Sequence, residues 1–545
     1  MVDNAKKRTK EWRIHMSDLQ SEIKKRRTFA IISHPDAGKT TLTEKFLLYG
    51  GAINTAGSVK GKATSKHAVS DWMEIEKERG ISVTSSVLQF NYDGYCINIL
   101  DTPGHQDFSE DTYRTLMAAD SAVMVIDASK GVEAQTIKLF KVCVMRNIPI
   151  FTFINKMDRE ARDTFDLLDE IEQVLGIKTC PINWPIGCGK EFKGVYDRNS
   201  KMVSSFQAVA TGGSKAAKET DLSIDDPALK EEVGELLYDK LLEEIELLDG
   251  ASDPFDIDLV SKGKLSPVFF GSALTNFGVE QFLNHFLQMT SSPLPRISDK
   301  GEIDPMGDHF SAFVFKIQAN MNKDHRDRIA FMRICSGKFE AGMEVTHVQS
   351  EKKMRLSQPQ QMMAKDRKIV EEAYAGDVIG VFDPGIFSIG DTVCVPSNKF
   401  RYEGIPTFAP EHFARLIQLD SMKRKQFVKG VTQIAQEGAI QIFQEYTAGM
   451  AEIIVGVVGV LQFDVLKYRL ENEYGCDIRL EPLSYSHIRW IKDRTIDPNT
   501  LKGVMDVKKV KDMKGNPLLL FNNEWNIRMV LEKNEGLELM EFSKE

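Results

Sequence analysis

The chain has 545 residues, of which 42% are hydrophobic and 27% charged, and its formal net charge is −9. This length predicts about three or four domains, and the negative charge argues weakly against a nucleic-acid partner. The seven cysteines include no Cys-x-x-Cys pair, which predicts neither a zinc site nor a disulfide framework and suits the reducing cytoplasm. The most apolar run, residues 453–466, is too short to span a bilayer, so we expect a soluble protein with no membrane partner.

The first predicted elements are a short β-strand over residues 27–33 and a helix over residues 40–51, joined by the sequence SHPDAGKT. The loop resembles the phosphate-binding pattern G-x-x-x-x-G-K-[ST], with Gly38 and Lys39 in the required positions. Its first position is Ser33 rather than glycine, and serine is small enough to let the backbone pass close to a phosphate. The strand–loop–helix context is the one that such a loop requires.

In this context the backbone N–H groups and the helix N-terminus face the anion. Lys39 is expected to reach the β- and γ-phosphates, and the Thr40 hydroxyl is expected to bind Mg²⁺. The predicted phosphate-binding loop comprises Ser33, His34, Pro35, Asp36, Ala37, Gly38, Lys39, Thr40 and Thr41.

A second motif, DTPGH, follows an apolar strand within residues 98–108. Asp101, at the end of the strand, can hold Mg²⁺ through a water molecule. Gly104 lacks a Cβ, so its N–H can approach a γ-phosphate, and loss of that phosphate would let the following segment relax. The predicted phosphate-side residues of this motif are Asp101, Thr102, Pro103 and Gly104.

Two further segments predict a guanine site. The run 148–158 ends in NKMD, and the Asp158 carboxylate can accept from N1 and N2 of guanine, a donor pair that adenine lacks. Lys156 is expected to pack its stem along the base. A strand–loop–helix over residues 265–282 carries the sequence GSAL, whose serine and alanine amides are expected to face the base oxygen. The predicted guanine-binding residues are Asn155, Lys156, Met157, Asp158, Ser272 and Ala273.

Residues 216–258 hold fifteen acidic and three basic residues, a local net charge of −12, so the rest of the chain carries +3 by difference. This acidic block is either a solvated helical face or a surface that docks on a basic partner protein. Both interpretations remain open at the level of the sequence.

Chance does not explain three nucleotide motifs in this order. The chain resembles the translational GTPases of the elongation-factor-G group, and within that group the bacterial peptide chain release factor three family. The resemblance rests on SHPDAGKTT, DWMEIEKERGISVTSSV, DTPGHQDF, NKMDRE and GSAL, and on RLIQLDSMKRKQFVKGVTQIAQEGAIQIF and VGVVGVLQFDVLKYRLENEYG near the C-terminus. It covers nearly the whole chain. A small residue other than glycine often opens the phosphate loop in this family, which accounts for Ser33.

The resemblance implies roles for further residues. His105 is expected at the attacking water, as a positioning or electrostatic group rather than a full proton acceptor. Ser82 takes the place of a threonine that coordinates Mg²⁺ in elongation factors, and its hydroxyl should preserve coordination, with Thr84 as a weaker alternative. Pro35 and Ile81 match the apolar positions that gate the histidine. The implied metal ligands are Thr40, Ser82 and, through water, Asp101.

The resemblance and the element pattern together predict the domain order. An α/β P-loop GTPase domain covers residues 1–296, with a subdomain inserted at about residues 183–258, because the gap before GSAL is too long for a loop. Short apolar runs separated by glycines predict a translation-factor β-barrel over residues 305–400. The order β-α-β-β-α-β predicts a ferredoxin-like α+β C-terminal domain over residues 408–545.

The resemblance implies a ribosome-dependent GTPase that promotes dissociation and recycling of class-I peptide chain release factors after termination. Its implied cofactors are GTP or GDP and Mg²⁺, its partners are the ribosome and the class-I factors, and we expect a cytoplasmic monomer. A translocase or ribosome-rescue GTPase is an alternative, disfavoured because the chain stops before the decoding-site domains of elongation factor G. A GTP-binding scaffold without catalysis is a third interpretation, disfavoured by the intact Asp101, Gly104 and His105. The basic runs 6–27 and 422–425 are solvated surfaces or ribosome contacts.

Overall fold

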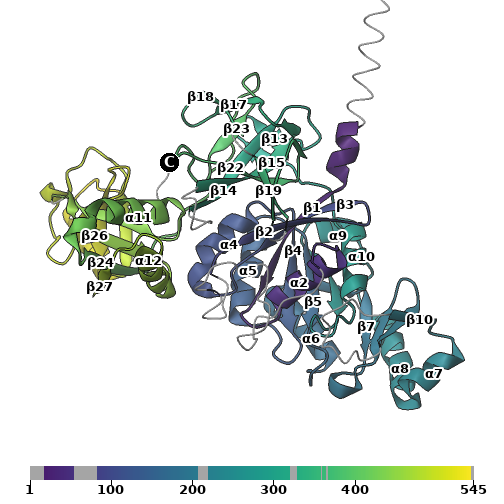
Figure 1. The fold of residues 1–545 in the computed structure, drawn as a ribbon. Helices are drawn as coiled ribbons and strands as arrows, with labels where there is room; N and C mark the ends of the chain where they lie inside the picture. Colours follow the sequence, from purple (N-terminus) through teal and green to yellow (C-terminus); the bar gives the residue numbers. More distant parts are fainter. Residues whose placement is uncertain are drawn as a thin grey trace, which may run out of the picture.

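The computed structural model describes residues 18–53, 76, 83–206, 219–319, 328–356, 359–363, 366–447 and 449–541. Three bodies follow one another along the chain, each built on its own main sheet (Figure 1). We call them the G domain (residues 26–289), the barrel domain (311–394) and the C-terminal domain (412–540). The predicted metal ligand Ser82, the predicted gate residue Ile81 and most of the basic run 6–27 lie outside the described residues.

The G domain is built on a seven-stranded sheet of order β2-β3-β1-β4-β5-β11-β6, in which only the edge strand β2 runs antiparallel to its neighbour. Helices cover both faces, so the inner strands β1, β4, β5 and β11 are buried at every position and apolar over most of their length. Alternate residues of β1 enter opposite cores: Phe29 lies in the cluster that contains residues of α2 and α10, whereas Ala30 lies in the cluster that contains residues of α4, α5 and α6. The strands are β1 Arg26–Ser33, β2 Ser86–Tyr92, β3 Tyr95–Asp101, β4 Ser121–Asp127, β5 Ile150–Asn155, β6 Lys178–Pro181 and β11 Leu265–Phe270. The helices are α2 Lys39–Tyr49, α4 Ser109–Leu116, α5 Ala134–Met145, α6 Thr164–Leu175 and α10 Val279–Met289, with a 3₁₀ turn η1 at Gln106–Phe108.

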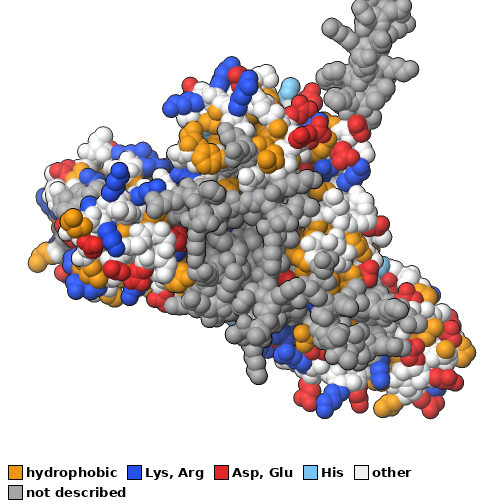
Figure 2. Space-filling view, viewed as in Figure 1, with side chains coloured by type: hydrophobic (Ala, Val, Ile, Leu, Met, Phe, Trp, Pro, Cys, Tyr) orange, Lys and Arg blue, Asp and Glu red, His pale blue; other side chains and the backbone are white. Residues whose placement is uncertain are grey.

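Between β6 and β11 the chain forms a small antiparallel sheet of order β10-β9-β8-β7 and the helices that follow it. Only Leu241 and Leu248 of α8, seven residues apart, are buried, and most acidic side chains of α7 and α8 lie at the surface (Figure 2). The described part of the acidic block therefore has the solvated helical face that the sequence suggested, while its docking on a basic partner stays a prediction. The elements are β7 Asn183–Ile186, β8 Gly194–Asp197, β9 Met202–Phe206, β10 Glu219–Ser223, α7 Pro227–Val233, α8 Glu235–Ala251 and α9 Ile257–Ser261.

The barrel domain is an antiparallel, barrel-like sheet of order β18-β17-β23-β14-β15-β22-β19-β20, which confirms the predicted fold class. Its long central strands β14 and β15 are buried at every position and supply six of the eighteen buried residues of its main core cluster. The strands are β14 Ser311–Ala319, β15 Arg328–Ser336, β17 Glu344–His347, β18 Lys352–Arg355, β19 Gln360–Met363, β20 Asp366–Ile369, β22 Val378–Phe382 and β23 Thr392–Cys394. A separate pair joins β16 Lys338–Glu340 to β21 Glu372–Tyr374.

The C-terminal domain begins with the predicted β-α-β-β-α-β order, and its strands lie in the order β27-β24-β26-β25 of a ferredoxin-like unit. A second set of strands, which the sequence did not let us place, extends the same sheet through pairing of β29 with β25. The first unit comprises β24 His412–Gln418, α11 Arg424–Gln436, β25 Gln441–Glu445, β26 Gly449–Val457, α12 Leu461–Asn472 and β27 Ile478–Leu483. The extension comprises β28 His487–Ile491, β29 Lys508–Lys511, β30 Pro517–Phe521, α13 Glu524–Lys533 and β31 Leu539–Met540.

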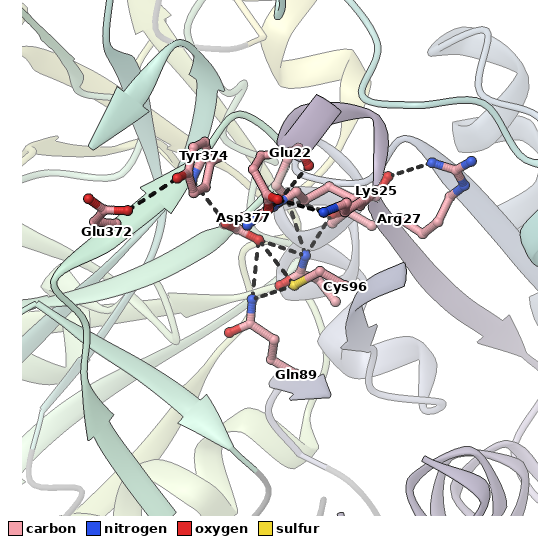
Figure 3. Close-up of polar contacts among 12 residues, drawn as sticks. Glu22, Lys25, Arg27, Gln89, Cys96, Glu372, Tyr374 and Asp377 are labelled. Atoms are coloured by element: carbon pink, nitrogen blue, oxygen red, sulfur yellow. Dashed lines mark hydrogen bonds and ion pairs between the residues drawn. The ribbon is translucent and has the colours of Figure 1, made fainter. Parts of the chain in front are cut away.

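The G domain and the barrel domain meet at a buried polar cluster around Asp377 (Figure 3). The carboxylate accepts hydrogen bonds from Arg26 and from Gln89, both at 3.2 Å, and from the Tyr374 amide at 2.9 Å. The Arg26 guanidinium also stacks on the Tyr374 ring at 4.4 Å and pairs with Glu22 at 2.6 Å. Because Asp377 is fully buried, its charge depends on these contacts in place of water, and those from Arg26 and Gln89 are made only when the domains dock.

Neighbouring groups extend this interface. Burial, together with the charge of Asp377, raises the pKa of Cys96 to about 12, so its thiol remains protonated at neutral pH. A second buried ion pair joins Asp120 of the G domain to Arg333 of the barrel domain at 2.5 Å. Two buried ion pairs therefore hold the two domains in one fixed relation.

We expect Asp377→Ala to lower the free energy of unfolding by about 3 kcal/mol, because Arg26 loses its buried carboxylate partner across the interface and keeps Glu22 as its charged partner. Urea unfolding followed by tryptophan fluorescence measures the change. The control Glu372→Ala removes an exposed ion pair with Lys338 and should cost at most about 1 kcal/mol. Equal losses in the two variants would contradict the role assigned to the buried pair.

Candidate functional site

The predicted nucleotide motifs meet at one edge of the G-domain sheet. Strands β1, β3, β5 and β11 are parallel and lie close together in the sheet, and each is followed directly by one of the four motifs. Ligands of open α/β sheets bind outside the carboxyl ends of the strands. The fold therefore brings all the described residues of the predicted site to this edge.

The phosphate loop has a backbone that requires glycine at position 38. Gly38 has a φ of 102° and is the N-cap residue of α2. A Cβ on this residue would lie 2.2 Å from Nδ2 of Asn155. The Asn155 amide also donates to the carbonyl of Ala37 at 2.8 Å, so the loop is fastened to the motif that follows β5.

The start of α2 fits a phosphate group. No side chain caps its N-terminus and no acidic residue occupies its first turn, so the N–H groups there remain oriented toward an anion. The Lys39 ammonium is almost fully buried and lies 2.6 Å from the Asp101 carboxylate. The Thr43 hydroxyl lies 3.4 Å from the same carboxylate, and the predicted metal ligand Thr40 directly follows Lys39 in the chain. A buried ammonium beside a carboxylate suits the binding of a nucleotide phosphate together with a divalent cation.

A side-chain hydrogen bond holds the backbone of the DTPGH motif against strand β1. The Thr102 hydroxyl donates to the Ile31 carbonyl at 2.7 Å, which fixes the loop after β3 against β1. Gly104 lies beside Pro35 of the phosphate loop, where an added Cβ would be 3.6 Å from the proline Cα. This contact is ordinary, so packing alone does not require glycine at position 104 in this arrangement.

Asp127 belongs to the site although the sequence analysis did not identify it. Lys156, in a left-handed conformation with φ 73°, donates to Asp127 and to the Asp36 carbonyl, both at 2.6 Å. Burial alone would raise the pKa of Asp127, but the hydrogen bonds from Lys156 and Ser129 bring it below its ordinary value. The carboxylate therefore stays charged and holds the lysine stem in place. Its position at the end of the apolar strand β4, between two motif-bearing strands, was the signal that could have revealed it.

The residues of the predicted guanine site form a closed set of contacts. The Ser272 hydroxyl donates to the Asp158 carboxylate at 2.5 Å, and the Ala273 amide donates to Oδ1 of Asn155 at 2.9 Å. Met157 is buried, and its amide donates to the Gly271 carbonyl at 3.1 Å.

Ser272 differs from its predicted role. Its amide donates to the Phe277 carbonyl at 2.9 Å and so does not point at a base oxygen, whereas its hydroxyl orients Asp158.

His105 caps the 3₁₀ turn η1 that follows the DTPGH motif. Its Nδ1 lies 3.2 Å from the amide nitrogen of Asp107 and 3.3 Å from the Asp107 carboxylate. The ring is about one-third exposed, and within the described part of the chain Nε2 has no hydrogen-bond partner. The arrangement leaves Nε2 as the ring atom available to a water molecule.

The segment that follows Ser82 is tied to three parts of the molecule. Glu76 accepts from the amides of Val83 and Thr84 at 2.9 and 3.0 Å, and the Thr84 hydroxyl lies 3.4 Å from the same carboxylate. Ser85 donates to Asp111 of α4 at 2.7 Å through its amide, and its carbonyl accepts from Lys316 of the barrel domain. In this arrangement Thr84 faces Glu76, which weakens its candidacy as an alternative metal ligand.

Three family models match the chain in the order of its domains. They are Elongation factor Tu GTP binding domain over residues 24–292, Elongation factor G domain 2 over residues 309–396, and Class II release factor RF3, C-terminal domain over residues 402–531. Together with the site just described, these matches define the chain as a GTPase of the translation-factor class that binds guanine nucleotides.

Several curated proteins named peptide chain release factor 3 are similar over nearly their full length. The one from Symbiobacterium thermophilum is 60% identical over 522 residues, which cover 96% of this chain and 98% of that protein. The one from Gloeobacter violaceus is 54% identical, and the match covers 96% of this chain and 99% of that protein. The one from Cyanothece sp. is 52% identical, and the match covers 96% of each chain. The chain belongs to the peptide chain release factor 3 family, whose members act in translation termination.

A crystal structure of a protein from Thermus thermophilus has the same fold, with a TM-score of 0.68 at 22% identity, over 89% of this chain and 72% of that one. Among the described residues, no helix combines the length and apolar character needed to cross a membrane.

We expect Asp158→Asn to lower affinity for GTP and favour xanthosine triphosphate. Xanthine has a carbonyl where guanine has its N2 amino group, and the new amide can donate to that carbonyl. A hydrogen bond to a charged group contributes about 1.5–3 kcal/mol, so the change in preference should exceed about tenfold. Nucleotide competition assays measure it.

The matched control is Ser272→Ala, which removes the hydroxyl that orients Asp158 but leaves the carboxylate. This variant should lose some GTP affinity without any gain for xanthosine triphosphate. The same ratio of GTP to xanthosine triphosphate binding in wild type and Asp158→Asn would remove Asp158 from base recognition.

Proposed function

We propose that this chain is a ribosome-stimulated GTPase whose GTP form promotes dissociation of class-I peptide chain release factors from the ribosome after termination, so that they are recycled. One observation carries the proposal: a complete set of guanine-nucleotide motifs lies at one sheet edge, in a chain that aligns over 96% of its length with proteins named peptide chain release factor 3. The C-terminal match to a release-factor model favours this function over that of a translocase or rescue GTPase.

In this proposal the phosphate groups bind at the N-terminus of α2. The N–H groups of its first turn face the phosphate oxygens, and Lys39 exchanges its contact with Asp101 for contacts with the β- and γ-phosphates. Thr40, Ser82 and, through water, Asp101 would hold Mg²⁺, which when bound neutralises charge on the phosphates.

The base would be read by Asp158, with Asn155 beside it and the Lys156 stem along its face. Ser272 contributes through its hydroxyl, which holds the carboxylate of Asp158 in one orientation. The Ala273 amide already donates to Asn155, so a base oxygen placed near it would share an N–H that is held in position. The closed contacts preorganise the pocket, which lowers the ordering cost of binding.

Hydrolysis would depend on His105 holding the attacking water at Nε2. In the neutral ring Nδ1 accepts from the Asp107 amide, which places the proton on Nε2 and makes it a donor to the water oxygen. A donor positions water but does not take its proton, and loose phosphoryl transition states ask little of a base. The ribosome would act by ordering the segments around Gly104 and Ser82, and loss of the γ-phosphate would release them.

We expect His105→Ala to separate nucleotide binding from hydrolysis. The phosphate and guanine contacts assigned to Lys39, Asn155 and Asp158 are untouched, so GTP affinity should stay within about threefold. Ribosome-stimulated hydrolysis should fall by about 100-fold or more, the usual loss on removing an orienting or proton-transfer group. Multiple-turnover GTPase assays with and without ribosomes measure the effect.

The matched control is His309→Ala, the same change at a half-exposed histidine of the barrel surface, and it should hydrolyse GTP normally. In termination complexes, His105→Ala should still displace a labelled class-I factor for one round and then remain bound. Unchanged ribosome-stimulated turnover in His105→Ala would remove this residue from the mechanism, and hydrolysis that no ribosome stimulates, even in wild type, would overturn the proposed function.

A further inference from the structure

The turn that carries His105 contacts the C-terminal domain through Asp107. The side chain of Asp107 is buried, and its Oδ2 accepts a hydrogen bond from the amide of Leu461 at 2.8 Å. Leu461 is the first residue of α12. A carboxylate of the G domain therefore caps a helix of a domain that lies more than 350 residues later in the chain.

Physical chemistry favours this contact. The first N–H groups of a helix have no partner within the helix, and the residue before α12, Val460, supplies no side-chain cap. A carboxylate placed there satisfies an N–H and interacts favourably with the helix dipole. Asp107 thus accepts a hydrogen bond from an N–H at the start of α12 that has no partner within the helix.

The approach of the two domains requires glycine at position 459. An added Cβ would lie 2.2 to 2.4 Å from the Cγ, Cβ and Cα atoms of Asp107, too close to a backbone atom to be relieved by a side-chain rotation. The turn that presents Gly459 is itself held by Gln462, whose side chain accepts from the amides of Val458 and Gly459. The C-terminal domain therefore offers Asp107 a preformed surface.

Apolar contacts surround this polar one. Val83, Phe108 and Val465 form a small buried cluster, with Leu461 packed against it. Val83 lies just after Ser82 and Phe108 lies in the turn of His105, so α12 contacts both segments that the proposed function requires to be ordered. The Phe108 ring is 6.2 Å from the His105 ring, centre to centre.

Asp107 also holds the ring of His105, in either of its protonation states. Its amide can donate to Nδ1 of the neutral ring from 3.2 Å, and its carboxylate can accept from Nδ1 of the protonated ring at 3.3 Å. One residue therefore touches the histidine on one side and the start of α12 on the other.

We propose that Asp107 is a positioning residue for GTP hydrolysis, and that docking of α12 on it through Gly459 and Leu461 sets the orientation of His105. The C-terminal domain thereby controls the hydrolytic step without contacting the nucleotide. This inference rests on the role proposed for His105.

The test uses the full chain and compares the single variants Gly459→Ala, Asp107→Ala and His105→Ala. It also combines Gly459→Ala and Asp107→Ala, one at a time, with His105→Ala. The first variant adds a Cβ that displaces Asp107, and the second removes the carboxylate without adding an atom. Each should lower ribosome-stimulated hydrolysis at saturating GTP by about tenfold or more, since a misplacement of about 1 Å can cost about 100-fold, while GTP affinity stays within about threefold. Gly404→Ala is the matched control, because an added Cβ there meets no atom within 4 Å, and it should behave as wild type.

The double variants distinguish positioning from a merely structural role. If Asp107 and Gly459 act through His105, adding either change to His105→Ala should slow hydrolysis no further. The inference would be overturned if the fold-losses in hydrolysis of the two single changes multiplied in the double variants. It would also be overturned if Gly459→Ala and Asp107→Ala hydrolysed GTP as fast as wild type. Normal hydrolysis by His105→Ala itself would instead show that the proposed role of His105 has failed, so the two failures remain distinguishable.

Discussion

One asparagine connects the parts of the nucleotide site. The side chain of Asn155 donates to Ala37 of the phosphate loop and accepts from Ala273 of the last motif, while its own backbone ends strand β5. Its Nδ2 also lies where a side chain at position 38 would have to be, so the left-handed glycine and the asparagine require each other. Three loops from distant parts of the sequence are thereby fixed before any ligand arrives, and a site built in this way spends little binding energy on ordering itself.

The sequence was most informative where function depends on short, local patterns. Phosphate and guanine recognition need particular residues at fixed spacing after a strand, so the motifs around Lys39, Asp101 and Asp158 could be found without a structure. The first half of the C-terminal domain was also predictable, because its helices and strands alternate with clear apolar periods. Its second half was not, since β29 and β30 are short and acquire their place by pairing with β25, with each other and with β28.

What the sequence did not predict is mostly a matter of long-range contact. Asp127 carries no motif of its own and became recognisable only when Lys156 was seen beside it. The role of Ser272 changed because its amide is taken by Phe277, a bond that no spacing rule indicates. The contact of Asp107 with Leu461 joins residues 354 positions apart, and that of Asp377 with Arg26 joins residues 351 positions apart. No local sequence pattern around any of these residues predicts the contacts.

The two domain junctions differ in kind. Between the G domain and the barrel domain, separation would expose ion pairs that are costly to break, which favours a single rigid body. The junction with the C-terminal domain includes a capped helix, a small apolar cluster, and hydrogen bonds from Arg114 to the Gly438 carbonyl at 3.1 Å and from Arg328 to Gln436 at 2.6 Å. Hydrogen bonds and apolar contacts of this kind cost less to separate than buried ion pairs, and the capped helix and the cluster lie next to the residues whose order matters for hydrolysis.

The pairing of Arg26 also has a consequence for folding during synthesis. During synthesis Asp377 emerges after Arg26 by a delay of about 18 to 70 s, given translation at roughly 5–20 residues per second and the 351 positions between them. Glu22, one helical turn before Arg26, is present from the start and lies 2.6 Å from the guanidinium. The nascent G domain therefore has a local carboxylate, Glu22, that can pair with Arg26 before the barrel domain is synthesised. Asp377 completes the pairing once the barrel domain has folded.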